Sequence, residues 1–238
     1  MLKARIKFRK YGVMKFIGHL DVMRYFQKAM RRADIPIAFT GGYSPHMIMS
    51  FAQPLGVGIT SEGEYLDIEL TEKISSEDAI SQLNRVMAEG IDVVSFVEIP
   101  DEKKASGMTI TAAASYRVYP LESEKTADIR VPLPEDWTAK IEGFLEQEHI
   151  TVWKKTKRSE KEVDIKPMIY EMHPDVDSIY LFLATGSEQN LKPDLVMDTF
   201  LDYIGAEKTA LHYHRVDVYA RDEAGAFVPL SDMGKIIL

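Results

Sequence analysis

The sequence contains no cysteine and no long hydrophobic run. The absence of thiols excludes disulfide bonds, a thiolate nucleophile, a cysteine-ligated zinc ion and a cysteine-ligated iron–sulfur cluster on this chain. The longest uninterrupted apolar stretch, residues 179–184, has the length of a strand and is far shorter than the roughly 18 residues of a membrane span. The basic N-terminal residues precede no apolar segment of the kind found in secretory signals. We therefore expect a cytoplasmic protein that does not bind membranes.

Charge is distributed unevenly along the chain. The formal net charge is −8, from 29 Lys and Arg against 37 Asp and Glu. Residues 1–60 contain 10 Lys or Arg and 2 Asp or Glu, a net charge of +8, whereas residues 61–102 carry −10 and residues 103–238 carry −6. An acidic total ordinarily disfavours a nucleic-acid partner, but a basic segment can still neutralise phosphates. The basic first quarter is therefore the expected place for a polyanion site.

Hydrophobic periodicity predicts an α+β protein. The order β-α-β-β-α-β in the first hundred residues is typical of a ferredoxin-like domain, and the second half repeats it with one extra strand. We expect two ferredoxin-like domains in tandem, residues 1–100 and 115–238, joined by a polar linker at 101–114. The expected strands are 2–9, 35–39, 65–70, 91–97, 116–121, 151–155, 163–172, 179–184 and 211–219, with a long loop at 40–64. The expected helices are 20–33, 76–88, 134–148 and 193–204.

Two basic surfaces are predicted in the first domain. Strict alternation in residues 2–9 places four cations on one side of a strand. Helices cover only one sheet face of a ferredoxin-like domain, so we expect these cations on the open face, where single-stranded RNA commonly lies. The alternative is that cross-strand ion pairs with residues 61–102 neutralise them. The strand surface consists of Lys3, Arg5, Lys7 and Arg9, and the second surface, a stripe on helix 20–33, of Arg24, Lys28, Arg31 and Arg32.

Two histidines are candidates for chemistry. Gly18 is expected to cap helix 20–33, and the Asp21 carboxylate is expected to interact favourably with the positive end of the helix dipole. His19 has no comparable structural role, and at a helix N-terminus a neutral imidazole can accept a proton or bind a phosphate-bearing ligand. His46 follows two adjacent glycines in the long loop 40–64, and loops of that length inside a compact domain are usually functional.

The second half offers weaker signals. Residues 154–161 contain five Lys or Arg, which indicates either a solvated hairpin turn or a second polyanion contact. His212 and His214 share one face of a strand, but two imidazoles alone are a weak metal signal, and we expect neither a metal nor a cofactor. The sequence has no Walker A loop, no Rossmann glycine fingerprint, no G-x-S-x-G and no H-E-x-x-H.

Several motifs together resemble one protein family, the radical SAM-associated (radical SAM-linked) proteins of the DUF2344 type. They are Phe16-x-Gly-His-Leu-Asp21-x-x-Arg24, Gly42-Tyr-x-Pro-His46, Ser50-Phe-Ala-x-Pro-Leu55 and Lys157-Arg-x-x-Lys161-x-Val-Asp164-Ile-Lys-Pro167. Gly18 and Met47 depart from the family pattern, where serine and proline are expected. The resemblance implies a radical SAM enzyme as partner, and the missing thiols place the radical chemistry on that other chain.

We therefore expect an accessory RNA-binding protein that presents RNA to a radical SAM enzyme. Two alternatives stay open. One is a metal-independent endoribonuclease of the RAMP type, with His19 and His46 as general base and acid, and the other is a protein-interaction scaffold. The expected binding residues are Arg5, His19, Asp21, Arg24, Arg31, Arg32, Gly42, Tyr43, His46, Ser50, Lys157, Arg158, Asp164 and Lys166.

Overall fold

The chain forms two compact units. The computed structural model describes residues 2–123, 129–155, 160–207 and 209–238. The first unit comprises Met1–Ala113 and Arg215–Leu238, and the second unit comprises Ala114–His214. This division differs from the expected one in two respects. The predicted linker belongs to the first unit up to residue 113, and residues 215–238 return to the first unit instead of completing the second.

The first unit is a sheet with two helices on one face. Its elements are β1 (Leu2–Lys10), η1 (Gly12–Phe16), α1 (His19–Arg32), β2 (Met49–Phe51), β3 (Thr60–Leu70), α2 (Ser76–Val86), β4 (Ile91–Ile99), η2 (Lys103–Ala105), α3 (Gly107–Ile110), the end of β10 (Leu211–Arg221), β11 (Phe227–Pro229), η5 (Leu230–Met233) and β12 (Lys235–Ile236). The strand order is β12-β4-β1-β3-β10, with β2 beside β3 and β11 beside β10. β1 runs antiparallel to both β3 and β4, and β2 runs antiparallel to β3.

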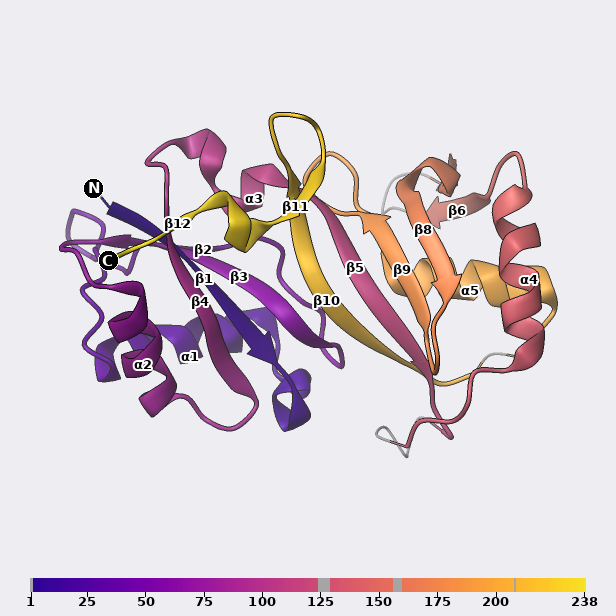
Figure 1. The fold of residues 1–238 in the computed structure, drawn as a ribbon, viewed down its shortest axis with the longest axis horizontal. Helices are drawn as coiled ribbons and strands as arrows, with labels where there is room; N and C mark the ends of the chain where they lie inside the picture. Colours follow the sequence, from indigo (N-terminus) through magenta and orange to yellow (C-terminus); the bar gives the residue numbers. More distant parts are fainter. Residues whose placement is uncertain (1, 124–128, 156–159, 208) are drawn as a thin grey trace. The chain divides into compact units, whose positions relative to one another are not determined.

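Apolar residues at helical spacing explain why α1 and α2 cover one face of the sheet. Figure 1 shows α1 and α2 side by side, and buried residues of both helices pack with the apolar side of β1, β3 and β4. Phe26 of α1 lies 4.7 Å from the Phe8 ring of β1, measured between ring centroids. Gly18 caps α1 as predicted, and the Ser75 hydroxyl accepts a hydrogen bond from the Asp78 amide at the start of α2.

The second unit combines strands with two packed helices. Its elements are β5 (Thr111–Pro120), which begins in the first unit, α4 (Glu135–Glu146), β6 (Thr151–Lys155), β7 (Glu160–Asp164), η4 (Lys166–Met168), β8 (Ile169–Pro174), β9 (Ile179–Ala184) and α5 (Pro193–Ile204). β9 lies between β5 and β8, whereas β6 and β7 form a separate two-stranded sheet. Phe144 of α4 and Phe200 of α5 are fully buried against each other.

The α+β class is confirmed, and the tandem ferredoxin-like arrangement stays a prediction. Residues 35–39 do not form a regular strand and make only isolated bridges at Ile37 and Phe39. The predicted strand 163–172 is divided into β7 and β8, because the short turn η4, which contains Pro167, lies between them. In the described part of the chain, no helix is both long and apolar enough to cross a bilayer.

The second face of the first sheet is closed, which corrects the prediction of an open basic face. Arg5 is only 1% exposed. Its guanidinium donates two hydrogen bonds to the Asp67 carboxylate, at 2.7 and 2.9 Å, and others to the carbonyl oxygens of Ala105 and Leu230. The Gly107 amide donates to the same carboxylate at 2.7 Å. The segments around η2, α3 and η5 therefore cover this face and are held there by one ion pair.

The neighbouring cations of β1 are also neutralised within the protein. The ammonium group of Lys7 lies 2.6 Å from the Asp217 carboxylate. That of Lys3 lies 2.9 Å from Asp101 and 3.5 Å from Glu69. Of the four predicted strand cations, Arg9 alone is exposed. Arg5 is consequently not available to an RNA phosphate.

Replacing Asp67 by alanine should destabilise the protein strongly. The variant Asp67→Ala leaves the Arg5 guanidinium buried without its carboxylate, a change that typically costs about 3–5 kcal/mol of unfolding free energy. Urea unfolding followed by circular dichroism measures the loss. The control Glu98→Ala removes an exposed carboxylate from β4 and should change stability by less than about 0.5 kcal/mol. A loss below about 1 kcal/mol for Asp67→Ala would contradict the role assigned to this pair.

Candidate functional site

The outer side of α1 is the main exposed basic surface among the predicted site residues. Arg24, Lys28, Arg31 and Arg32, called here the α1 basic face, are all exposed. Arg24 pairs with Asp21 at 3.2 Å, and both side chains are about two-thirds exposed, so this pair is weak and easily exchanged. Arg32 donates to the Val86 carbonyl oxygen at 3.2 Å. The helix therefore presents cations to solvent along its length.

Helical geometry explains this surface. Arg24, Lys28 and Arg31 are separated by four and three residues, the spacing that aligns side chains on one helix face. The opposite face holds Phe26 and Met30 in the core, which fixes the orientation of α1. The stripe spans about 10 Å along the helix axis, from a rise of about 1.5 Å per residue.

The loop 40–46 presents His46 and Tyr43 to solvent. The His46 amide donates to the Thr40 hydroxyl at 3.1 Å, and the imidazole Nδ1 lies 3.1 Å from the same oxygen. The Thr40 amide donates to the His46 carbonyl oxygen, which closes the loop. Gly42 has φ +98°, a conformation that favours glycine. The Tyr43 side chain is fully exposed, so its ring is free to stack on a ligand.

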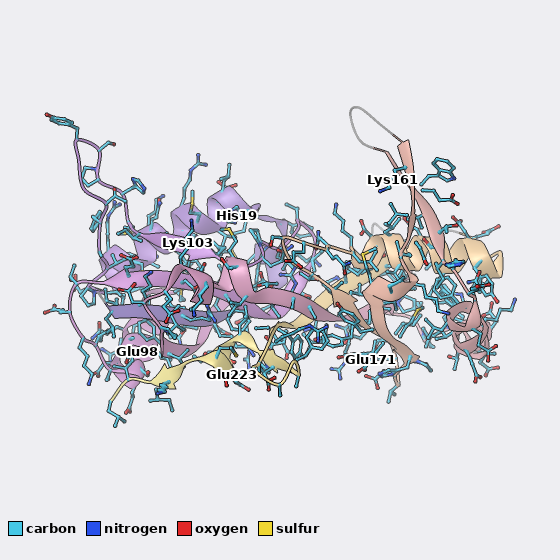
Figure 2. All side chains as sticks on the ribbon, turned by 90° about the horizontal axis from the view of Figure 1, so that it is seen from above. His19, Glu98, Lys103, Lys161, Glu171 and Glu223 are labelled. Atoms are coloured by element: carbon cyan, nitrogen blue, oxygen red, sulfur yellow. The ribbon has the colours of Figure 1, made fainter. Side chains whose placement is uncertain are left out.

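His19 lies in a small pocket at the N-terminus of α1, where Figure 2 labels it. Its ring meets the Phe51 ring edge-on at a centroid distance of 4.9 Å. The space inside is about 10 Å³, roughly the room needed by one water molecule. The lining residues are Phe8, Lys10, His19, Val22, Phe51, Pro54, Leu55 and Glu64.

Buried charges next to His19 were missed by the sequence reasoning. Glu64 is 3% exposed and accepts hydrogen bonds from the Arg215 guanidinium at 3.0 and 3.2 Å. Burial raises the pKa of the Glu64 carboxyl, although Arg215, Ser61 and Lys10 oppose this shift. Burial also lowers the pKa of Lys10, whose ammonium donates to the Ile17 carbonyl oxygen at 3.0 Å.

The sequence contains a pattern that indicates two members of this cluster of buried charges. In β1, Lys10 is two residues from the core-facing Phe8, and in β3, Glu64 is two residues from the core-facing Leu66, so each charged residue shares the core-facing side of its strand. Phe8 and Glu64 are also directly paired across the two strands. A charged residue at a core-facing position is rarely buried unless it is paired. Arg215 could not be found in this way, because it reaches the cluster from a strand 151 residues away along the chain.

His46 and Ser50 have surroundings that differ from those of His19. Among the described residues, no hydrogen bond or ring contact joins His19 to His46. Ser50 lines a different cavity of about 130 Å³, together with Lys3, Asp67 and Glu69.

Asp164 and Lys166 have local structural roles in the second unit. Asp164 accepts hydrogen bonds from the amides of Ile150 and Lys166, each at 3.0 Å. The His149 imidazole, 2.9 Å away, lowers the pKa of the Asp164 carboxyl. The Lys166 ammonium donates to the Gln147 carbonyl oxygen. Lys157 and Arg158 lie outside the described residues.

His212 and His214, the two histidines of β10, were only a weak metal signal in the sequence. His212 is buried, and its ring stacks on Tyr119 at a centroid distance of 6.3 Å. Within the described ranges, no group of three or more His, Asp or Glu side chains is arranged to hold a metal ion.

Comparison with known proteins gives one family match. The family model described as "Uncharacterized protein conserved in bacteria (DUF2344)" matches residues 3–193. No curated protein matches the chain. The matched range includes the α1 basic face, the loop 40–46 and the His19 pocket, but it ends before Arg215 and Leu230, which complete the buried ion pairs of the first unit.

Neutralising Glu64 should alter the pH dependence of stability. A carboxyl whose pKa is raised on folding stabilises the protein fully below its unfolded pKa, and this contribution is lost as pH rises through the folded pKa. The variant Glu64→Gln cannot titrate there. The free energy of unfolding of the wild type should therefore fall relative to Glu64→Gln as pH rises above the ordinary glutamate value of 4.5.

Urea unfolding at a series of pH values from 4.5 to 8 measures this difference. Both proteins are unfolded in the same series of buffers, so that the two curves differ only in residue 64. Parallel curves for wild type and Glu64→Gln would show that the carboxyl does not titrate with a raised pKa.

Proposed function

Since this chain belongs to the DUF2344 family of conserved bacterial proteins, and its exposed cations concentrate on one helix, we propose that it binds RNA and presents it to a radical SAM enzyme. The α1 basic face is the observation that carries the proposal. Its four side chains are exposed. The acidic residue of the helix, Asp21, forms an ion pair with Arg24 that is itself exposed to solvent. Counterions on such a surface are readily exchanged for phosphates.

The chemistry of the α1 basic face suits a phosphodiester backbone. Lys28 and Arg31 make no side-chain hydrogen bond or ion pair with another described residue, so their donors are available to a ligand. An arginine guanidinium can bind one phosphate through two parallel hydrogen bonds, whereas a lysine ammonium acts as a point charge. Contacts of this kind fix the position of an RNA without reading its sequence.

The exposed loop 40–46 supplies groups of the type that read bases. Tyr43 offers a fully exposed ring, and His46 offers a ring whose Nδ1 side is fixed by Thr40. Proteins recognise unpaired RNA bases by stacking them on aromatic side chains and by hydrogen bonds to their edges. We assign Tyr43 and His46 to base contacts, and the α1 basic face to phosphate contacts.

The partner in this proposal is an enzyme that carries the cluster this chain cannot bind. The sequence has no cysteine, so it offers no thiolate ligands for an iron–sulfur cluster. The motifs shared with radical SAM-associated proteins support such an enzyme as the recipient of the RNA. We assign no catalytic step to this chain, because His19 and His46 share no described contact or pocket that would favour an acid–base pair.

We propose a ferredoxin-like fold for the first unit alone, whereas the sequence suggested two ferredoxin-like domains. The order β1-α1-β2-β3-α2-β4 and the antiparallel neighbours of β1 and β3 support a ferredoxin-like interpretation of the first unit. In this interpretation η2, α3 and η5 are additions that cover the sheet face left free by the helices. RNA binding is therefore proposed on the helix side of the first unit.

Reversing two charges on α1 should weaken RNA binding. The double variant Lys28→Glu, Arg31→Glu removes two proposed phosphate contacts, and the slope of log affinity against log salt should become shallower by about 1.4 for single-stranded RNA. Filter binding of a labelled RNA from 50 to 200 mM salt measures both affinity and slope. Affinity at the lowest salt concentration should fall at least roughly tenfold.

A matched control separates this effect from net charge. Lys103 and Lys104 are exposed on η2, which covers the opposite side of the sheet from α1; Figure 2 labels Lys103. The double variant Lys103→Glu, Lys104→Glu changes net charge by the same amount and should bind RNA nearly as well as the wild type. Equal losses in both double variants would refute a localised site.

Association with a radical SAM enzyme should survive removal of RNA if the partner binds the protein directly. Affinity-tagged protein, purified from its own cells with and without nuclease treatment, is analysed by mass spectrometry for radical SAM enzymes. Recovery in at least one of the two samples is expected. Absence of every such enzyme from both samples would refute the proposed partnership while leaving RNA binding to be judged by the filter assay.

A further inference from the structure

The cavity that Ser50 lines, called here the Ser50 cavity, lies within the first unit on the side of the sheet that η2 and α3 cover. Ser50 of β2 is paired with Asp67 of β3, and Lys3 of β1 is paired with Glu69 of β3. Residues paired across neighbouring strands project to the same side, so these four side chains share one face of the sheet. The polar lining residues are Lys3, Ser50, Asp67, Glu69, Glu102 and Ser106.

The size of the Ser50 cavity suits a small organic molecule. Its volume is about 130 Å³, whereas one water molecule needs roughly 10–15 Å³ and a cavity of roughly 150 Å³ holds a benzene ring. Ile48, Met49, Ile68 and Ile99 supply the apolar part of the lining. An apolar lining with a few polar groups is typical of small-molecule sites. The cavity therefore has room for a short alkyl chain that carries one polar head group.

The charges of the lining favour a cationic head group. The charged lining residues are Lys3, Asp67, Glu69 and Glu102. The Asp67 carboxylate is already paired with the buried guanidinium of Arg5. Two carboxylates then remain against the single ammonium group of the lining. A ligand carboxylate or phosphate would be repelled by them, whereas a ligand ammonium group would be attracted.

The existing ion pairs of the lining leave these carboxylates accessible to a ligand. The Lys3 ammonium lies 2.9 Å from Asp101 but 3.5 Å from Glu69, so Asp101 is its closer partner. Glu102 pairs with Lys104 at 2.9 Å, and both side chains are exposed, so this pair is weak and easily exchanged. The hydrogen bond that Lys3 donates to Asp101 raises the pKa of the Lys3 ammonium, and Glu69 adds to this shift. These surroundings already stabilise a positive charge.

Two hydroxyl groups complete the polar lining. The side chains of Ser50 and Ser106 make no hydrogen bond with another described residue, so both can accept one from a ligand. A primary ammonium group has three N–H donors and no acceptor. Carboxylate and hydroxyl oxygens are therefore the partners that such a group requires.

We infer that the Ser50 cavity binds a small primary amine, with the alkyl chain against the apolar lining and the ammonium group donating to Glu69 and Ser50. Hydrogen bonds between charged partners are shorter and stronger than those between neutral groups, so Glu69 supplies most of the selectivity. The site lies on the opposite side of the sheet from the α1 basic face. The inference is therefore independent of the proposed RNA binding.

Three probes that share one alkyl chain test the preference for a cation. They are n-pentylamine, n-pentanol and pentanoate, each added to the full-length protein near neutral pH. Nuclear magnetic resonance of isotope-labelled methionine methyl groups follows the cavity, since Met49 lines it and the variant Met49→Leu identifies its signal. The amine should shift this signal saturably, and pentanol should bind at least roughly tenfold more weakly. Pentanoate should leave the signal unchanged.

Variants of two polar lining residues locate the head group. Glu69→Gln keeps the shape of the side chain without its charge and should weaken n-pentylamine binding at least roughly tenfold. Ser50→Ala should weaken it by roughly threefold, because one hydroxyl acceptor is lost. The control Glu98→Gln removes the same charge from an exposed position of β4 outside the lining and should bind the amine as the wild type does; Figure 2 labels Glu98.

The outcomes decide the inference separately from the proposed function. Equal affinity for n-pentylamine and n-pentanol, saturable binding of pentanoate, or no saturable shift with the amine would each overturn it. The same holds if Glu69→Gln keeps the wild-type circular dichroism spectrum and binds the amine normally. If Glu69→Gln does not fold, Ser50→Ala decides, and unchanged amine affinity in that variant refutes the assigned contact. The filter assay judges RNA binding whatever the amine result.

Discussion

The buried ion pair between Arg5 and Asp67 organises the first unit. Two charges removed from water are tolerated only where their hydrogen-bonding groups are satisfied, and here the backbone of Ala105, Gly107 and Leu230 completes the set. These partners come from segments far apart in the sequence. One side-chain pair thereby joins η2, α3 and η5 to the sheet, on a face that lies in the interior of the unit.

Closure of that face decides where a polyanion can bind. Three cations of β1, Lys3, Arg5 and Lys7, are engaged by Asp101, Asp67 and Asp217, so their charge is compensated within the protein. The first unit as a whole contains 17 Lys and Arg against 18 Asp and Glu. A surface with unbalanced positive charge must therefore lie where acidic residues are few, and α1 carries four Lys and Arg against the single acidic residue Asp21.

Local patterns were predicted well, and long-range partners were not. The bounds of α5 match the prediction, and those of α1 differ by one residue at each end, because apolar spacing and capping are encoded within one or two turns. The exposure of Arg24 and Arg31 also followed from the local pattern. The burial of Arg5 did not, because its carboxylate partner lies 62 residues away and its carbonyl partner at Leu230 lies 225 residues away. The alternative of cross-strand ion pairs with residues 61–102 holds for Arg5 with Asp67 and for Lys3 with Glu69, so the predicted open basic face was wrong.

The second unit is inserted between two parts of the first, and this arrangement has a consequence for the order of synthesis. During translation the ribosome delivers β1, α1 and β4 well before β10 and η5 emerge. Until Asp217 and Leu230 arrive, Lys7 and Arg5 lack partners that they have in the finished protein. Most of the first unit is synthesised before the second unit. The first unit nevertheless reaches its final structure last, after the complete sequence of the second unit has left the ribosome.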